Sequence, residues 1–369
     1  ERDKINKEND ELNKLIKTLN SILSDKTKRM DIIKDELNEI NERYGDERRS
    51  EIEHAAAEFT VEDMIPDEDM VITISHQGYI KRTSLDEYRT QSRGGVGAKG
   101  VKTKDDDFNE HLFVASTHNY LLIFTEFGKV FWKKVWEIPE GSKVSKGRAI
   151  QNLINIESGD NIRSVITISN LTDEDYLNNN FLVMCTEGGT VKKTKLEAYS
   201  RPRVNGINAI KIKENDRLLD VKLTNGDNHI IIAKRSGKAI NFHESNVRPM
   251  GRTASGVRGV KLENEKDRVV GMICVAREDS DLLVVSKNGY GKRSSISDYR
   301  ITKRGGKGVM TLKITDKTGN LVSIKEVKTN DELMIINKSG ITIRTSITDE
   351  NIRVMGRATQ GVKLIKLSD

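Results

Sequence analysis

Six related segments, each built around a glycine turn, recur between residues 71 and 351 and constrain the fold more than any other feature. Each segment contains an apolar run, a turn with glycine, and a second run that is often basic. Asn288-Gly289 is a typical hairpin turn, since tight turns need residues that tolerate positive φ. The turn glycines recur at a spacing of about 50 residues. They are Gly78, Gly128, Gly189, Gly237, Gly289 and Gly340.

This repeat predicts a mainly β fold in which every segment supplies a hairpin to its own small sheet. Six such units indicate a closed radial array, a six-bladed propeller-like disc over residues 67–369. A β-sandwich would not repeat so regularly. The longest spacing, between the second and third units, contains SNLTDEDYLNNN (169–180), which we interpret as a polar surface insertion. Residues 46–66, before the disc, predict a linker.

Residues 1–45 predict helices instead of strands. They contain no proline, and apolar residues such as Leu12, Leu15 and Leu19 fall three or four positions apart, with a break near Asp25. This spacing places an apolar stripe on a helix, so we expect a coiled-coil arm. A solitary solvated helix is the alternative, but the stripe needs a partner that buries it. Because the chain begins without Met, we expect it to be part of a longer polypeptide.

A second feature follows each hairpin: a loop that combines glycine with arginine or lysine. The first-unit loop contains Gln91, Arg93, Gly94, Gly95, Gly97 and Lys99, and the fifth-unit loop contains Lys303, Arg304, Gly305, Gly306 and Lys307. The other loops contribute Lys146, Arg148, Arg201, Arg203, Arg252, Arg258, Arg353 and Arg357. The second strands of the first and fifth units add Lys81, Arg82, Lys292 and Arg293. We predict that these residues bind a polyanion together.

The stretch from Gly95 to Gly100 matches G-x-G-x-x-G, the spacing of a dinucleotide-binding loop. That motif needs a helix directly after it. The residues that follow, VKTKDDDFNEH, have neither the period nor the apolar face of such a helix, and the other five loops do not keep the spacing. We therefore reject a dinucleotide site. A P-loop is excluded as well, because nothing matches its pattern.

Glycine beside a cation suits contact with phosphate. Glycines let backbone N–H groups approach an anion closely, and basic side chains add charge-assisted hydrogen bonds. Six such loops around a disc would meet a duplex in turn and would contact its phosphates instead of its bases, with salt-sensitive binding. In the alternative interpretation the glycines form inter-blade turns and the charges confer solubility. That alternative stays open for the second- and third-unit loops.

The composition is compatible with a polyanion-binding protein. The net charge is +6, and the excess lies after residue 50, which is compatible with nucleic acid. Cys185 and Cys274 lie in apolar runs, so we expect reduced, buried thiols in a cytoplasmic protein, with a disulfide as the alternative. No apolar run approaches the roughly 18 residues of a membrane span. The six histidines show no spacing typical of a metal site.

Two segments resemble parts of the bacterial type IIA topoisomerases, in the subunit that cleaves DNA. NERYGDERRSEI (41–52) is similar to the exit from the cleavage core, and the six repeats resemble the C-terminal β-pinwheel. Gln91 to Gly97 resembles the seven-residue gyrase A box, although Ser92 and Val96 replace its usual cations. Arg43-Tyr44 invites comparison with the strand-cleaving tyrosine, but its context is a helix exit, and we expect Tyr44 to be a packing residue.

The resemblance implies a DNA-wrapping disc in a bacterial, cytoplasmic enzyme that introduces negative supercoils. It implies duplex DNA as ligand, a gyrase B subunit in an A2B2 heterotetramer, a homodimer through an upstream core, and no membrane partner. We expect no catalytic residue, metal or cofactor in this chain, whereas the complete enzyme would need Mg²⁺ and ATP. The corresponding domain of topoisomerase IV is one alternative. A propeller that serves as a protein-interaction platform is another.

Overall fold

The computed structural model of the chain describes residues 1–46, 50, 61–88, 107–142, 144–277, 279–336 and 342–365. The chain divides into two compact units, residues 1–60 and 61–369, which we treat separately. The division falls within the predicted linker. In the described ranges, no helix is long and apolar enough to cross a membrane.

The first unit contains two helices, α1 (Arg2–Ser24) and α2 (Lys26–Tyr44). They are separated at Asp25, as the break in the apolar pattern predicts, and the Asp25 carboxylate caps α2 by accepting from Thr27 N at 2.9 Å. Neither helix has a buried residue. The coiled-coil arm therefore stays a prediction. Tyr44, which we expected to pack, is 78% exposed.

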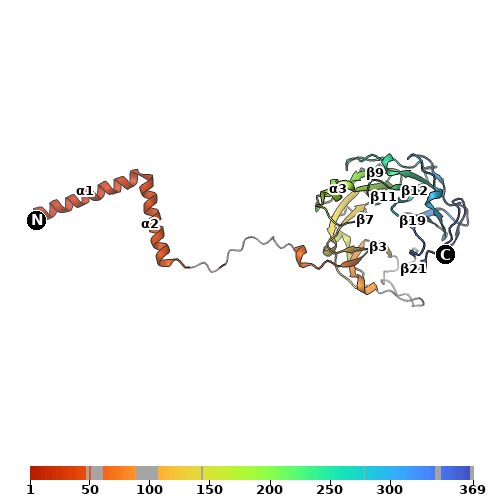
Figure 1. The fold of residues 1–369 in the computed structure, drawn as a ribbon, viewed down its shortest axis with the longest axis horizontal. Coiled ribbons are helices and arrows are strands. Elements are labelled where there is room, and N and C mark those ends of the chain that lie inside the picture. The colour runs from red at the N-terminus through yellow and green to blue at the C-terminus, as the bar shows by residue number, and fades with distance from the viewer. Residues whose placement is uncertain are drawn as a thin grey trace. The chain divides into compact units, whose positions relative to one another are not determined.

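The second unit consists of small antiparallel sheets that follow one another around a ring, as Figure 1 shows. Each repeat begins with the predicted hairpin. The hairpins are β1 (Asp69–Ser75) with β2 (Tyr79–Ser84), β4 (Tyr120–Thr125) with β5 (Lys129–Lys134), β8 (Phe181–Thr186) with β9 (Thr190–Lys195), β12 (His229–Lys234) with β13 (Lys238–His243), β16 (Asp281–Ser286) with β17 (Tyr290–Ser295), and β20 (Glu332–Ile336) with β21 (Thr342–Ser346). The turn glycines of the first five have φ between 78° and 83°, which confirms the turn prediction.

A third and a fourth strand complete each of the first five sheets. The third strand lies beside the first strand of the hairpin; these strands are β3 (Asn109–Ser116), β7 (Ile162–Ile168), β11 (Leu218–Thr224), β15 (Val269–Val275) and β19 (Leu321–Val327). The fourth is a short edge strand beside the hairpin's second strand; these strands are β6 (Arg148–Ala149), β10 (Ile207–Asn208), β14 (Val257–Arg258), β18 (Val309–Met310) and β22 (Val362–Lys363). Each edge strand comes from the next repeat along the chain, so neighbouring repeats are joined by strand exchange.

The prediction of six blades is wrong in one respect. The described residues form five four-stranded sheets, and the sixth repeat contributes the two-stranded sheet β20–β21. Strand exchange explains the missing edge strand, because each complete sheet takes its edge strand from a following repeat, and no third strand is described beside β20. No described repeat follows the sixth, and its own edge strand, β22, pairs with β17 in the fifth sheet.

The short helices join the strands of each repeat. The 3₁₀-helices are η1 (Val61–Met64), η2 (Leu85–Tyr88), η3 (Val135–Glu137), η4 (Ile150–Asn152), η5 (Leu196–Tyr199), η6 (Glu244–Asn246) and η7 (Ile296–Asp298). The predicted polar insertion contains the α-helix α3 (Glu174–Asn179). It also contributes to the core, because Leu171 and Leu177 are buried against the second and third sheets.

The core is divided among the interfaces between neighbouring sheets. Ile72 and Ile80 of the first sheet, for example, are buried with Leu121 and Phe131 of the second. Similar clusters join the second sheet to the third and so on around the ring. Each repeat is thus stabilised mainly by its two neighbours, as in other repeat architectures.

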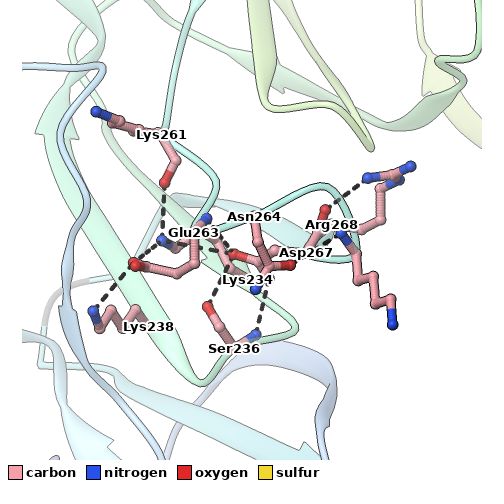
Figure 2. Close-up of polar contacts among 9 residues, drawn as sticks. Lys234, Ser236, Lys238, Lys261, Glu263, Asn264, Asp267 and Arg268 are labelled. Atoms are coloured by element: carbon pink, nitrogen blue, oxygen red, sulfur yellow. Dashed lines mark hydrogen bonds and ion pairs between the residues drawn. The ribbon is translucent and has the colours of Figure 1, made fainter.

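An aspartate caps the hairpin turn in four repeats. Asp160, for example, is buried, and its Oδ1 accepts from Phe127 N at 3.1 Å. Asp107, Asp216 and Asp267 accept from the equivalent turn at 2.7–3.0 Å. In the fourth repeat this aspartate belongs to the ionic cluster in Figure 2, where Lys234 Nζ lies 2.8 Å from Glu263 Oε1.

The two cysteines are free thiols, as expected. Cys185 is buried, whereas Cys274 is only half-buried. Burial raises the pKa of both thiols, so both stay protonated at neutral pH.

Candidate nucleic-acid interface

In repeats two to six, the basic loop lies between a hairpin and the short edge strand that docks on the preceding sheet. A glycine in the left-handed region stands directly before that strand in five repeats. At Gly308, φ is 77° and an added Cβ would lie 2.4 Å from Ala239 O. At Gly256, φ is 93° and the distance to Val191 O would be 2.6 Å. These glycines are required by strand docking, because no larger residue fits at the contact.

Backbone hydrogen bonds join neighbouring loops along the edge of the second unit. Lys211 N donates to Ala254 O at 3.2 Å, which links the third loop to the fourth. Gly305 N donates to Gly259 O at 2.6 Å, which links the fifth loop to the fourth. Lys313 N donates to Thr359 O at 3.1 Å, which links the fifth to the sixth. These bonds join the third- to sixth-unit loops into one continuous strip. We call this strip, together with the second-unit loop, the loop rim.

Exposed cations follow this loop rim. Seven of the predicted residues are exposed: Arg148, Arg201, Arg203, Arg258, Lys303, Lys307 and Arg353. They come from the loops of repeats two to six and could all meet a ligand that runs along the edge. The inter-blade-turn alternative stays open for the second- and third-unit loops, because Gly147 and Gly206 precede docking strands and exposed cations also suit solubility.

The fifth-unit loop contains a surface pocket of about 170 Å³. Arg300, Lys303, Lys307 and the backbone of Gly306 line it, and no acidic residue is among the lining residues. Gly305 has φ 83°, which turns the loop here. The pocket therefore offers positive charge and backbone groups to a small anionic group. Arg300 is a residue that sequence reasoning missed, although its position beside the loop gave a signal.

Four predicted loop cations are half-buried, and three of them, Lys146, Arg304 and Arg357, contact neighbouring segments. Arg304 donates from Nε to Asn246 O at 2.9 Å and from Nη1 to Arg258 O at 3.1 Å. Lys146 Nζ lies 3.7 Å from the centroid of the Tyr79 ring. Arg304 is thus a brace between two loops as well as a surface charge. Arg252 and Arg357 are the other two.

Three of the second-strand cations are not at the surface, which corrects three predicted ligand contacts. Lys81, Lys292 and Arg293 are at most 2% exposed, and Arg82 is half-buried with Nη2 3.2 Å from Glu140 Oε2. Lys81 Nζ donates to two carbonyl oxygens of the next loop, both at 2.8 Å. Each of these four second-strand cations contacts the repeat that follows, so they hold the next loop in place from its buried side.

Lys292 and Arg293 show this role most fully. Lys292 Nζ donates to Gly356 O and Arg357 O of the sixth-unit loop. Arg293 donates to Ile352 O at 2.8 Å and its Nη2 lies 2.6 Å from Asp349 Oδ1. The third repeat repeats the arrangement with Lys192 and Lys193, which the sequence analysis missed.

The box prediction lies outside the described residues. Gln91, Arg93, Gly94, Gly95, Gly97 and Lys99 are the residues concerned. Within the described ranges, no group of three or more His, Cys, Asp or Glu residues could hold a metal ion.

A disc of strand-exchanged sheets with a cationic loop rim defines a class of propeller-like domains. A model of the DNA gyrase C-terminal domain, a β-propeller, matches residues 69–116, 119–169, 180–225, 229–276, 280–328 and 331–369. The chain therefore belongs to the gyrase A family of DNA topoisomerases, through its C-terminal β-propeller domain. This confirms the resemblance and the six repeats in sequence.

Relatives and solved structures agree with this assignment. The chain is 45% identical over 372 residues to the gyrase A protein of Staphylococcus epidermidis and 44% identical over 371 residues to that of Staphylococcus aureus. It spans 41% of the length of both relatives. A gyrase A C-terminal domain superposes with a TM-score of 0.68 at 27% identity, covering 82% of this chain and 97% of that chain. The C-terminal domain of DNA topoisomerase IV gives 0.66 at 27% identity, with 82% and 90% coverage.

Proposed function

We propose that this chain binds duplex DNA along the loop rim and bends it around the edge of its second unit. One observation carries the proposal: the loops of repeats three to six are joined into one strip with exposed cations at each step. Backbone groups and guanidinium or ammonium ions in such a strip suit phosphates and read no base edges. Bending would favour flexible sequences.

In the complete protein, this domain would present wrapped DNA for strand passage. We infer from the gyrase relatives that the chain acts with a gyrase B subunit in an A2B2 heterotetramer of the bacterial cytoplasm. That enzyme would be a type II topoisomerase that uses ATP and Mg²⁺ to introduce negative supercoils. Topoisomerase IV is the nearest alternative, because its C-terminal domain superposes almost as well.

The central test is a topoisomer ligation assay with the 369-residue chain. We expect it to bind duplexes of about one hundred base pairs and to constrain positive writhe on a nicked circle that is then ligated. The affinity should fall steeply with salt, because each neutralised phosphate contributes about −0.9 to the slope of log K against log salt. Salt-insensitive binding, or topoisomers unchanged by the protein, would contradict the proposal.

A pair of charge reversals assigns the binding to the rim. Lys303→Glu with Lys307→Glu removes two cations from the fifth-unit pocket and should weaken DNA binding. The slope of log K against log salt should become less steep by about two. Lys325→Glu is the matched control, because Lys325 is an exposed lysine on β19, away from the loops. If the rim variant binds DNA like the wild type, the second candidate, a protein-interaction platform, is favoured.

A further inference from the structure

Two buried lysines behind the loop rim carry positive charge that no carboxylate balances. Lys192 and Lys292 are both 0% exposed. Lys192 Nζ donates to Ala209 O at 2.6 Å and to Arg252 O at 2.5 Å. Lys292 Nζ donates to Arg357 O at 2.6 Å. Among the described residues, neither ammonium forms an ion pair.

Three other buried cations of this disc do have acidic partners. Lys193 Nζ lies 2.6 Å from Glu244 Oε2, and Lys234 Nζ lies 2.8 Å from Glu263 Oε1. Arg293 is paired as well. Because an unpaired buried charge is costly, proteins normally satisfy it with a carboxylate. Two exceptions at equivalent positions therefore need an explanation.

The charged and titratable neighbours of both lysines are few. Lys192 faces Arg252 of the fourth-unit loop, and the Tyr199 hydroxyl donates to the same Ala209 carbonyl, at 3.3 Å. Burial, and then the like charge of Arg252, lowers the pKa of Lys192 to about 8. The arginine and the lysine repel each other across a short stretch of loop.

Lys292 has the same environment with one addition. It faces Arg357 of the sixth-unit loop, Asp298 of η7 and the buried Tyr299 ring, over which Arg357 lies. Burial, and then Arg357, lowers the pKa of Lys292 to about 8, while Asp298 raises it. Both loop arginines are half-buried but reach the rim.

We propose that Lys192 and Lys292 are positioning residues whose missing counter-charge is supplied by DNA phosphates on the fourth- and sixth-unit loops, so that DNA binding takes up protons. The inference rests on the proposed function of the rim. A phosphate beside Arg252 or Arg357 offsets the repulsion and favours the ammonium form. By linkage, the protonated protein binds DNA more tightly. Affinity should therefore decrease as pH rises through about 8, the pKa of both lysines.

The first experiment uses the wild-type chain alone. Binding of a duplex of about one hundred base pairs is titrated by calorimetry at pH 7, 8 and 9, in two buffers of different ionisation enthalpy and at constant salt. If DNA raises each pKa by about one unit, affinity should fall roughly fivefold per lysine between pH 7 and 9. The buffer pair should report net proton uptake near pH 8.5.

Substitutions of the two lysines test whether they are the groups that take up the protons. Lys192→Met and Lys292→Met should each remove part of the pH dependence, and the double variant should bind with a flat profile. Phe131→Met is the matched control, because Phe131 occupies the same third position of β5, is 1% exposed and carries no charge. It should keep the wild-type profile.

The outcomes separate the two proposals. DNA binding by the wild type without proton uptake overturns this inference and leaves the proposed function intact. A wild-type chain that binds no DNA overturns the proposed function itself. If the methionine variants do not fold, the wild-type calorimetry still decides. A pH dependence that persists in the folded double variant also refutes the role of the two lysines.

Discussion

Replacing Arg293 with methionine tests whether this residue joins two repeats in the interior or contacts DNA. Arg293 is 1% exposed and lies at the interface between the fifth and sixth repeats. Its guanidinium pairs with Asp281 at 3.1 Å and with Asp349 at 2.6 Å, and it donates to Ile352 O and Thr329 Oγ1. A guanidinium that is buried and fully partnered in this way is not available to DNA.

The magnitude follows from what the substitution leaves behind. Asp281 is 16% exposed, and burial already raises its pKa while Arg293 lowers it. Loss of Arg293 leaves this carboxylate without its cation, and breaking a buried pair from one side costs about 3–5 kcal/mol. Asp349 is 77% exposed and can be hydrated again, so we expect the lower end, about 3 kcal/mol.

The loss should be local, because repeats are stabilised by their neighbours. Hydrogen exchange is therefore the assay of choice, and we expect the amides of the sixth repeat to lose most protection. A lower urea midpoint of unfolding would support the loss of stability. The matched control is Arg258→Met, an exposed rim arginine, which should weaken DNA binding with little change in stability. If Arg293→Met instead keeps its exchange protection and loses DNA affinity, the buried-junction reasoning is refuted.

Two other substitutions test single contacts. Gly308→Ala should destabilise the chain by roughly 1–3 kcal/mol, measured by urea unfolding, because its Cβ would meet Ala239 O at φ 77°. Glu263→Gln tests how stability depends on acid pH. Hydrogen bonds from Lys234 and Lys238 lower the pKa of Glu263 to about 2. The stability that the Glu263 carboxylate contributes is therefore present above about pH 5 and lost as pH falls towards 2. The wild type and this variant should thus differ in unfolding free energy at neutral pH and converge below about pH 2.

The repeat and its turns could be predicted from the sequence because their signals are local. A glycine flanked by two β-rich runs defines a hairpin within about 18 residues, and Gly78 or Gly289 adopts the positive φ that this requires. The loops could be recognised in the same way. The helix break at Asp25 is also local, since one carboxylate caps the next helix.

The buried dibasic pairs could not be predicted from local pattern. Lys292 contacts Gly356 O, 64 residues further along the chain, and strand exchange is what brings the two together. A charged residue on a strand normally indicates solvent, so all four second-strand cations seemed to be ligand contacts. One signal was present: the position of Lys292 is occupied by Phe131 and Ile240 in other repeats, and both are buried. Comparing repeats would have revealed an interior position.

The number of complete sheets depends on the same exchange. A period in the sequence counts hairpins, and the count of hairpins was correct. It does not show which repeat supplies the edge strand of each sheet, because two-residue strands such as β18 and β22 have no pattern of their own. The missing edge strand of the sixth sheet follows from that connectivity.

The contact that the fourth residue of each hairpin's second strand makes with the next repeat alternates in chemistry, which bears on how the rim holds its curvature. After odd repeats, a buried cation binds the next repeat, as Lys193 binds Glu244. After even repeats, neutral donors do so: Trp132 Nε1 donates to Tyr199 O at 3.0 Å, and Asn241 Nδ2 to Tyr299 O at 2.9 Å. Salt screens buried pairs much less than exposed charges. Rising salt should therefore release DNA from the exposed rim before it loosens these buried contacts, so the disc keeps its curved edge for the next duplex.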